Sequence, residues 1–81
     1  MIFARLKFAT NHRVLDGDGA AVTYAAGETH LVEHGAARGI ISAGAATLLE
    51  VPEQRDTTTG LIVDASERAD IFADLSALSP G

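Results

Sequence analysis

Two histidines four positions apart, each beside an acid, are the residues best suited to chemistry in this chain. His30 and His34 lie near Glu28 and Glu33, and zinc sites use imidazole and carboxylate ligands. Two histidines at this spacing share one face only when both belong to the same helix. We expect His30 in a strand, His34 at the start of a helix and His12 on a remote turn. This placement favours surface histidines, and we predict no metal and no cofactor.

The other reactive residue types also lack the setting that catalysis requires. The chain has no cysteine, which excludes a thiolate nucleophile and a disulfide. Ser42 lies between two apolar residues of a predicted helix, without the sharp turn that exposes a nucleophilic serine. Ser66 and Ser76 have the placement of helix-end residues. No lysine follows the glycines in the way a phosphate-binding loop requires, and we predict that the protein is not an enzyme.

The repeated Asp-Gly step at positions 16–19 is the strongest turn signal in the sequence. Glycine and aspartate favour the positive φ angles of a hairpin loop. A calcium loop needs further oxygen ligands that end in a bidentate acid, and the apolar residues that follow supply none. We therefore interpret 16–19 as a hairpin loop.

The chain of 81 residues is strongly asymmetric in charge. Its formal net charge is −5, yet Arg5, Lys7 and Arg13 are the only charges in the first thirteen positions. Nucleic-acid binding needs clustered basic residues, so we predict no nucleic-acid partner. A basic edge on an acidic body fits a protein partner better, although a solvated face is the alternative.

No segment approaches the length of a membrane span, which needs about 18 apolar residues or more. The amino-terminal segment MIFARLKF lacks the features of a signal peptide. We expect a soluble protein without a membrane partner, made in the cytoplasm.

The elements of the first half are indicated by alternation and by glycines. Apolar residues at 2, 4, 6 and 8 alternate with Arg5 and Lys7, which is typical of a half-buried strand. The segment 13–15 is too short to assign, and 20–24 is a second predicted strand. Gly27 follows it at a position suited to positive φ, and we predict a hairpin turn at 26–27 that leads into a strand ending at Val32.

In the stretch 24–50 the ends of the predicted elements are marked more clearly than elsewhere in the chain. Ala37, Ile40 and Ile41 fall on one helical face, and Gly44 has the placement of a helix-closing glycine. Interior glycines at 35 and 39 weaken a helix by roughly 1 kcal/mol each, so we expect them to allow close approach to another backbone. An apolar strand over 47–51 should follow and end at Pro52.

The last third contains a polar segment at 53–60, which predicts an exposed loop. The run Leu61-Ile62-Val63 predicts a buried strand. Asp64, with Ser66 as the rival, should cap a helix whose apolar stripe continues to Leu78. This helix either packs on the domain's own sheet, which we favour, or docks on a neighbouring subunit. The expected fold is one small α+β domain, with a mainly antiparallel sheet or partial barrel and two short helices, in which 61–78 could form a separate arm.

The arrangement in 24–50 resembles small proteins from the head and tail modules of tailed bacteriophages. The resemblance rests on a turn glycine (Gly27), a strand leucine (Leu31), a helical pair (Ile40-Ile41) and a closing Gly44-Ala45. It covers about a third of the chain and transfers no functional residue. It implies a structural virion protein, and our first choice is a capsid decoration or cement protein that binds the shell of major capsid protein.

Two alternatives stay open. The first is a head-tail connector or tail-completion subunit in a ring, and the second is a small cytoplasmic regulatory or ligand-binding module. Under the first choice the protein would be made in the host cytoplasm, reside in the virion and be oligomeric or bound to the assembly. The residues expected to contact the partner are Arg5, Lys7, Ile71, Phe72 and Leu75.

Overall fold

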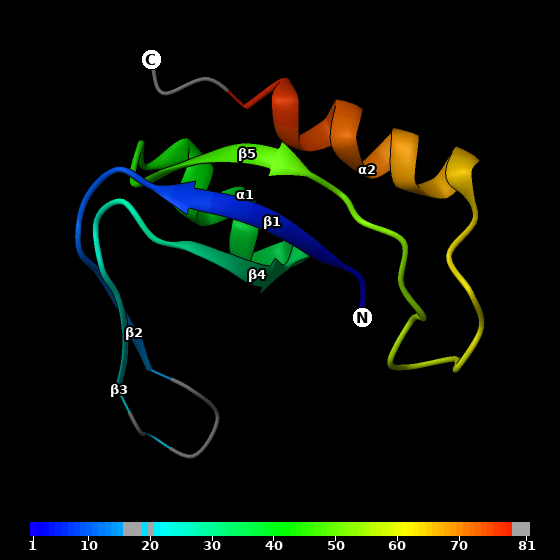
Figure 1. The fold of residues 1–81 in the computed structure, drawn as a ribbon, viewed down its shortest axis with the longest axis horizontal. Coiled ribbons are helices and arrows are strands. Elements are labelled where there is room, and N and C mark those ends of the chain that lie inside the picture. Colours follow the sequence, from blue (N-terminus) through cyan, green and yellow to red (C-terminus); the bar gives the residue numbers. More distant parts are fainter. Residues whose placement is uncertain (16–18, 20, 79–81) are drawn as a thin grey trace.

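The structure, a computed structural model, describes residues 1–15, 19 and 21–78. It contains five strands and two helices within these residues (Figure 1). In chain order they are β1 (Phe3–Phe8), β2 (His12–Leu15), β3 (Ala21–Tyr24), β4 (Thr29–Glu33), α1 (His34–Ser42), β5 (Ala46–Glu50) and α2 (Ala65–Ser76). The predicted small α+β fold is confirmed, with an open sheet in place of a barrel among these elements.

The strands form one three-stranded antiparallel sheet in the order β4-β1-β5 and a separate two-stranded ribbon, β2-β3. The two pairings belong to one long bent hairpin. Phe3 lies opposite Glu33 in β1-β4, and Arg13 lies opposite Thr23 in β2-β3. In both pairs the two residue numbers have the same sum, so the β2-β3 pairing continues the register of the β1-β4 pairing through the bend. The predicted hairpin loop at 16–19 joins β2 to β3, and apart from Gly19, whose φ is +81°, it lies outside the described residues.

A turn forms at 26–27 as predicted, but it does not connect two paired strands, so its prediction as a hairpin turn is wrong. Gly27 has a φ of +86°, and the Glu28 N–H donates to the Ala25 carbonyl at 3.1 Å, so a glycine turn does form. However, β3 and β4 do not pair with each other, because β4 pairs with β1. The turn therefore bends the long hairpin where β3 passes into β4.

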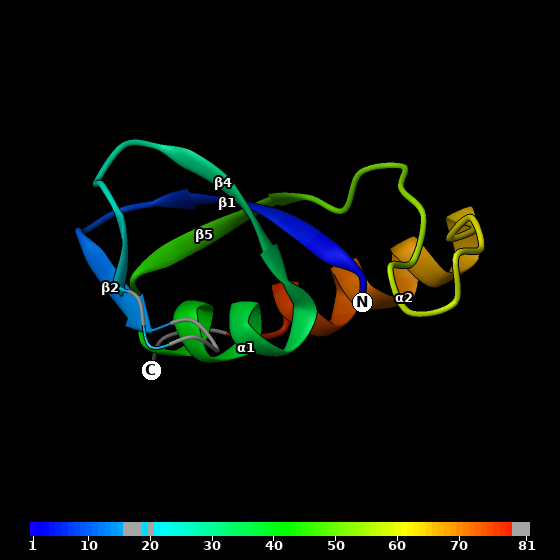
Figure 2. The same ribbon diagram turned by 90° about the horizontal axis from the view of Figure 1, so that it is seen from below.

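Both helices lie on the same side of the three-stranded sheet (Figure 2). The inward side chains of β1, namely Ala4, Leu6 and Phe8, are fully buried there, as the alternation predicts. The core is a single cluster to which β1, β4, α1, β5 and α2 all contribute. Its buried members are Ala4, Leu6, Phe8, Val32, Ala37, Ile40, Ile41, Ala45, Ala46, Val51, Ile71 and Leu75.

Helix α1 closes at the predicted glycine, and Glu33 lies just before its first residue, as the N-cap. The Glu33 carboxylate caps it by accepting from the Gly35 N–H at 2.8 Å, and Gly44 follows the last turn with a φ of +77°. The expected close approach at Gly35 and Gly39 is wrong. A Cβ on Gly39 would meet nothing within 4 Å, and one on Gly35 would meet only the Glu33 carboxylate.

The predicted buried strand at 61–63 is also wrong. Leu61 and Ile62 are 68% and 69% exposed, and only Val63 is buried. A single bridge between Arg55 and Ile62 replaces the strand. The next residue behaves as expected, since Asp64 caps α2 by accepting from the Glu67 N–H at 2.8 Å.

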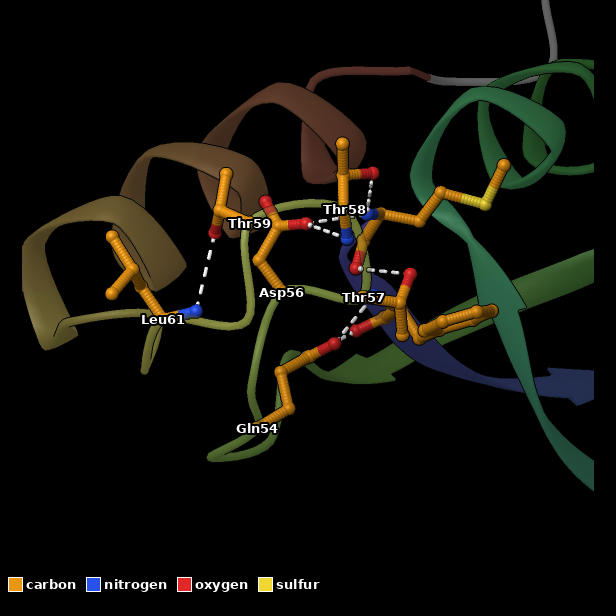
Figure 3. A network of polar contacts seen from close by, with 8 residues as sticks. Gln54, Asp56, Thr57, Thr58, Thr59 and Leu61 are labelled. Atoms are coloured by element: carbon orange, nitrogen blue, oxygen red, sulfur yellow. Dashed lines mark hydrogen bonds and ion pairs between the residues drawn. The ribbon is translucent and has the colours of Figure 1, made fainter.

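The polar loop at 53–60 is exposed, as predicted, and it is also tied to the first residues of the chain (Figure 3). The Gln54 amide accepts from the Phe3 N–H at 2.6 Å and donates to the Phe3 carbonyl at 2.7 Å. The Met1 amino group contacts the Asp56 carboxylate at 2.5 Å and the Thr58 hydroxyl at 2.8 Å. Since Ile71 and Leu75 also join the common core, both halves of the last third contact the body of the domain.

Candidate protein-binding surface

One face of the three-stranded sheet carries no helix, and it is the candidate surface on which several of the predicted contact residues lie. The helices cover the opposite face (Figure 2). Because side chains alternate along a strand, the odd positions of β1 and β4 point to the open face. Arg5 lies opposite Leu31, and Lys7 lies opposite Thr29.

A bulge in the β1-β5 pairing adds an extra side chain to the open face. The register shifts between Arg5 and Leu6, so Leu49 and Glu50 lie in succession opposite Arg5. Leu48 before them and Val51 after them pack against the core, whereas Leu49 is 44% exposed. Because of the bulge, Leu49 and Glu50 both point outward, and the next side chain, Val51, points to the core again.

Two exposed leucines form the apolar part of this open face. Leu31 of β4 is 50% exposed and Leu49 of β5 is 44% exposed, one on each side of β1. Arg5 lies between them and pairs with Glu50 at 3.3 Å, a surface ion pair of a kind that contributes less than about 1 kcal/mol. Lys7 is exposed and has no ion pair among the described residues. The face thus combines apolar side chains with an Arg5–Glu50 ion pair and the ammonium group of Lys7.

The other predicted contact residues lie on α2, and they have different environments. Ile71 and Leu75 are buried in the core of the same chain, whereas Phe72 is 42% exposed. Phe72 lines a shallow groove with Val51 and Arg68, between α2 and the end of β5. Of the three residues on α2, Phe72 alone is available to a partner in this structure.

The histidines occupy two different places. His30 lies in β4 and His34 begins α1, as expected. His12, however, is in β2, and its ring centroid is 6.1 Å from that of Phe8. Phe8 also stacks on Tyr24 at 4.7 Å and meets His30 edge-on at 5.9 Å. The expectation that His12 is remote is wrong, because the bend in the hairpin gathers these four rings.

His34 belongs to a polar cluster that joins the two helices. Its Nε2 lies 2.8 Å from the Asp74 carboxylate, which also contacts the Arg38 guanidinium. Hydrogen bonds from Arg38 and then from His34 hold the pKa of Asp74 below its usual range. The cluster contains a single carboxylate, and its contacts connect α1, through His34 and Arg38, to Asp74 of α2.

The described part of the chain shows no group of three or more histidine and acidic side chains placed to hold a metal. An apolar groove of about 280 Å³ lies between β5, α1 and the end of α2, lined chiefly by Ile41, Leu48, Leu75 and Leu78. Over the same described ranges, neither helix is long and apolar enough to cross a membrane.

Sequence reasoning found the basic residues of the open face but missed its leucines. Leu31 and Val32 are adjacent apolar residues, and the pairing of β4 with β1 determines which of them points outward. Leu49 lies in an apolar run with no alternation, and the bulge seen in the structure determines that its side chain points to the open face. The alternation of β1 was the one signal in the sequence for this face.

Comparisons of the chain with models of protein families, with curated proteins and with solved structures gave no match.

Proposed function

We propose that this protein is a structural, non-catalytic subunit that binds other proteins, and specifically that it decorates or cements a bacteriophage capsid. The observation that supports the proposal best is the open face of the sheet, with Leu31 and Leu49 exposed beside Arg5 and Lys7. Exposed apolar side chains grouped on one face are typical of interaction sites. The capsid as the particular partner comes from the resemblance of 24–50 to phage head and tail proteins.

The shape and charge of the surface also favour a protein partner. Small-molecule sites are concave and enclose most of their ligand, whereas the two leucines lie on the outer face of a three-stranded sheet. Lys7 of β1, which has no ion pair among the described residues, would complement an acidic group on a partner, and such complementarity raises association rates and specificity. Phe72 offers a second apolar contact on α2.

Co-sedimentation with capsids tests this function. The test first looks for a major capsid protein gene beside this one; particles assembled from that capsid protein are then mixed with the purified 81-residue protein. We expect saturation at hundreds of copies per particle, whereas about a dozen copies or fewer would indicate a connector ring. Absence of a neighbouring capsid gene, or no binding at saturating protein, would contradict the proposal.

Substitutions on the proposed surface sharpen the test. We expect Lys7→Glu and Phe72→Asp to weaken capsid binding about tenfold or more, since each places a carboxylate at the contact. Ala36→Asp, on the exposed side of α1, is the control and should bind normally. If Phe72→Asp unfolds the domain as much as it weakens binding, Phe72 belongs to the core and not to the interface.

A further inference from the structure

The outer edge of β4 is an unpaired strand edge, and its chemistry fits a second copy of itself. No described strand pairs with this edge, because β4 is the terminal strand of the order β4-β1-β5. Unpaired edges offer a row of backbone N–H and C=O groups to another strand. The strand is five residues long, Thr29 to Glu33.

The hydrogen-bond pattern identifies which backbone groups point outward. The Phe8 N–H donates to the Glu28 carbonyl, and the His34 N–H donates to the Ile2 carbonyl, both at 2.9 Å. Bonded and non-bonded pairs alternate along an antiparallel ladder, so the even residues of β4 bond to β1. The N–H and C=O of Leu31, at the centre of the strand, therefore face the open edge.

The β4 edge lacks the features that protect the other side of the sheet. Strand β5 carries a bulge, has Pro52 two residues beyond its last residue Glu50, and has α2 packed against it. Bulges, prolines and covering elements all discourage edge-to-edge pairing. Strand β4 has no proline, no lysine and no bulge in its pairing with β1, and its central outward side chain is Leu31.

We propose that two copies of this chain form a symmetric dimer in which β4 pairs antiparallel with β4 of the second copy, centred on Leu31. The two Leu31 residues then exchange both backbone hydrogen bonds across the twofold axis, and their half-exposed side chains lie next to each other on the open face. Thr29 of each copy faces Glu33 of the other. The contact is isologous, so it closes at two copies and leaves β4 fully paired.

Charge complementarity supports this register. On the open face, Lys7 lies beside Thr29, and the dimer places Glu33 of the second copy on the far side of Thr29. Strands are about 4.8 Å apart, so that glutamate, which caps α1 of its own copy through one carboxylate oxygen, lies one strand beyond Thr29 as seen from Lys7. No like charges face each other between the two β4 strands, because their remaining pairs join His30 to Val32 and Leu31 to Leu31.

Sedimentation of the isolated full chain tests the dimer, without any capsid component. We expect a particle of twice the 8.4 kDa chain mass. Leu31→Lys should convert it to a monomer, because two ammonium groups would meet at the twofold axis, and folding is monitored by circular dichroism. Leu49→Lys, at a similarly exposed site on the other side of β1, is the matched control and should remain dimeric. A wild-type monomer at about 1 mM, or a dimer disrupted by Leu49→Lys alone, would overturn the proposal.

A second measurement decides the matter even if Leu31→Lys fails to fold. The chain has no cysteine, so Leu31→Cys introduces the only thiol. Directly opposed residues in a bonded pair have Cα atoms about 5.5 Å apart, within the range of a disulfide. Mild oxidation should yield a covalent dimer for Leu31→Cys and monomer for Leu49→Cys, and equal yields would overturn the pairing. Because the proposal concerns the protein alone, it can hold or fail independently of capsid binding.

Discussion

The side-chain amide of Gln54 hydrogen-bonds both backbone polar groups of Phe3, as a neighbouring strand would. Strand β5 ends at Glu50, so β1 has no strand partner on that side at Phe3. Gln54 supplies one, and its amide nitrogen also donates to the Pro52 carbonyl at 3.0 Å. A single residue thereby extends the edge of the sheet.

We predict that Gln54→Ala destabilises the protein by about 1–3 kcal/mol, because it leaves partly buried backbone groups of Phe3 without partners. Urea unfolding measures the change. Glu53→Ala, at the exposed preceding residue, is the matched control and should change stability by less than about 0.5 kcal/mol. Equal effects of the two substitutions would contradict this role for Gln54.

The sequence could not reveal this residue. Segment 53–60 contains no apolar side chain and therefore indicates only an exposed loop. The groups of the first strand region that Gln54 and Asp56 contact belong to Phe3 and Met1, more than fifty positions away. Two of those groups are the backbone N–H and C=O that every residue except proline carries, so no side-chain pattern identifies them.

Among the elements, α1 is the one that its sequence specifies most completely. Its buried face and its closing glycine at 44 follow from local signals, and the structure adds a cap at Glu33. Its interior glycines invited a packing explanation, which fails because Gly39 is exposed. A helical glycine with open space around it lowers helix stability without a compensating contact.

We predict that Gly39→Ala raises the free energy of unfolding by up to about 1 kcal/mol, because alanine fits the helix and restricts the unfolded chain. Gly44→Ala is the matched comparison and should destabilise the protein, since Gly44 has a φ of +77°, which alanine adopts at a cost of roughly 1–2 kcal/mol. Thermal unfolding of both variants measures the difference. A stabilised Gly44→Ala would contradict the assignment of that residue as the helix stop.

The run at 61–63 shows where local signals fail. Its composition favours a strand, but β4, β1 and β5 form the sheet without it, and the Arg55–Ile62 bridge is its one strand-like contact. Val63 is buried and Asp64 caps α2, so the segment connects the loop to the helix. Composition indicated the propensity of these residues, whereas the available sheet edges decided their structure.

At the scale of the whole molecule, two carboxylates connect distant parts of the chain. Contact with the N-terminal ammonium lowers the pKa of Asp56, and hydrogen bonds from Arg38 and then His34 lower that of Asp74. A pKa that is lower in the folded state contributes stability above the unfolded-state value, and that stability is lost as the pH falls through the folded-state pKa. Both carboxylates thus contribute at neutral pH.

We predict that stability declines as the pH falls below about 4, the unfolded-state pKa of aspartate. Asp74→Asn should be less stable than the native chain at pH 7 and should lose less stability on acidification, because it removes one of the titrating ties. Asp70→Asn, an exposed position on the same helix, is the control. Urea midpoints from pH 7 to 2 measure the effect, and identical pH profiles for native and Asp74→Asn protein would contradict it.

The long hairpin also has a consequence for how the chain folds. All of its strand pairs, from Leu15 with Ala21 to Phe3 with Glu33, share one offset, so each pair that forms brings the next one together. Loop-closure entropy grows only slowly with loop length, and closing from the tip divides that cost into small steps. Pairing can therefore zip from the ribbon, through the bend, to the start of α1. Strand β5 and α2 lie outside this hairpin, so they dock on it after its strands have paired.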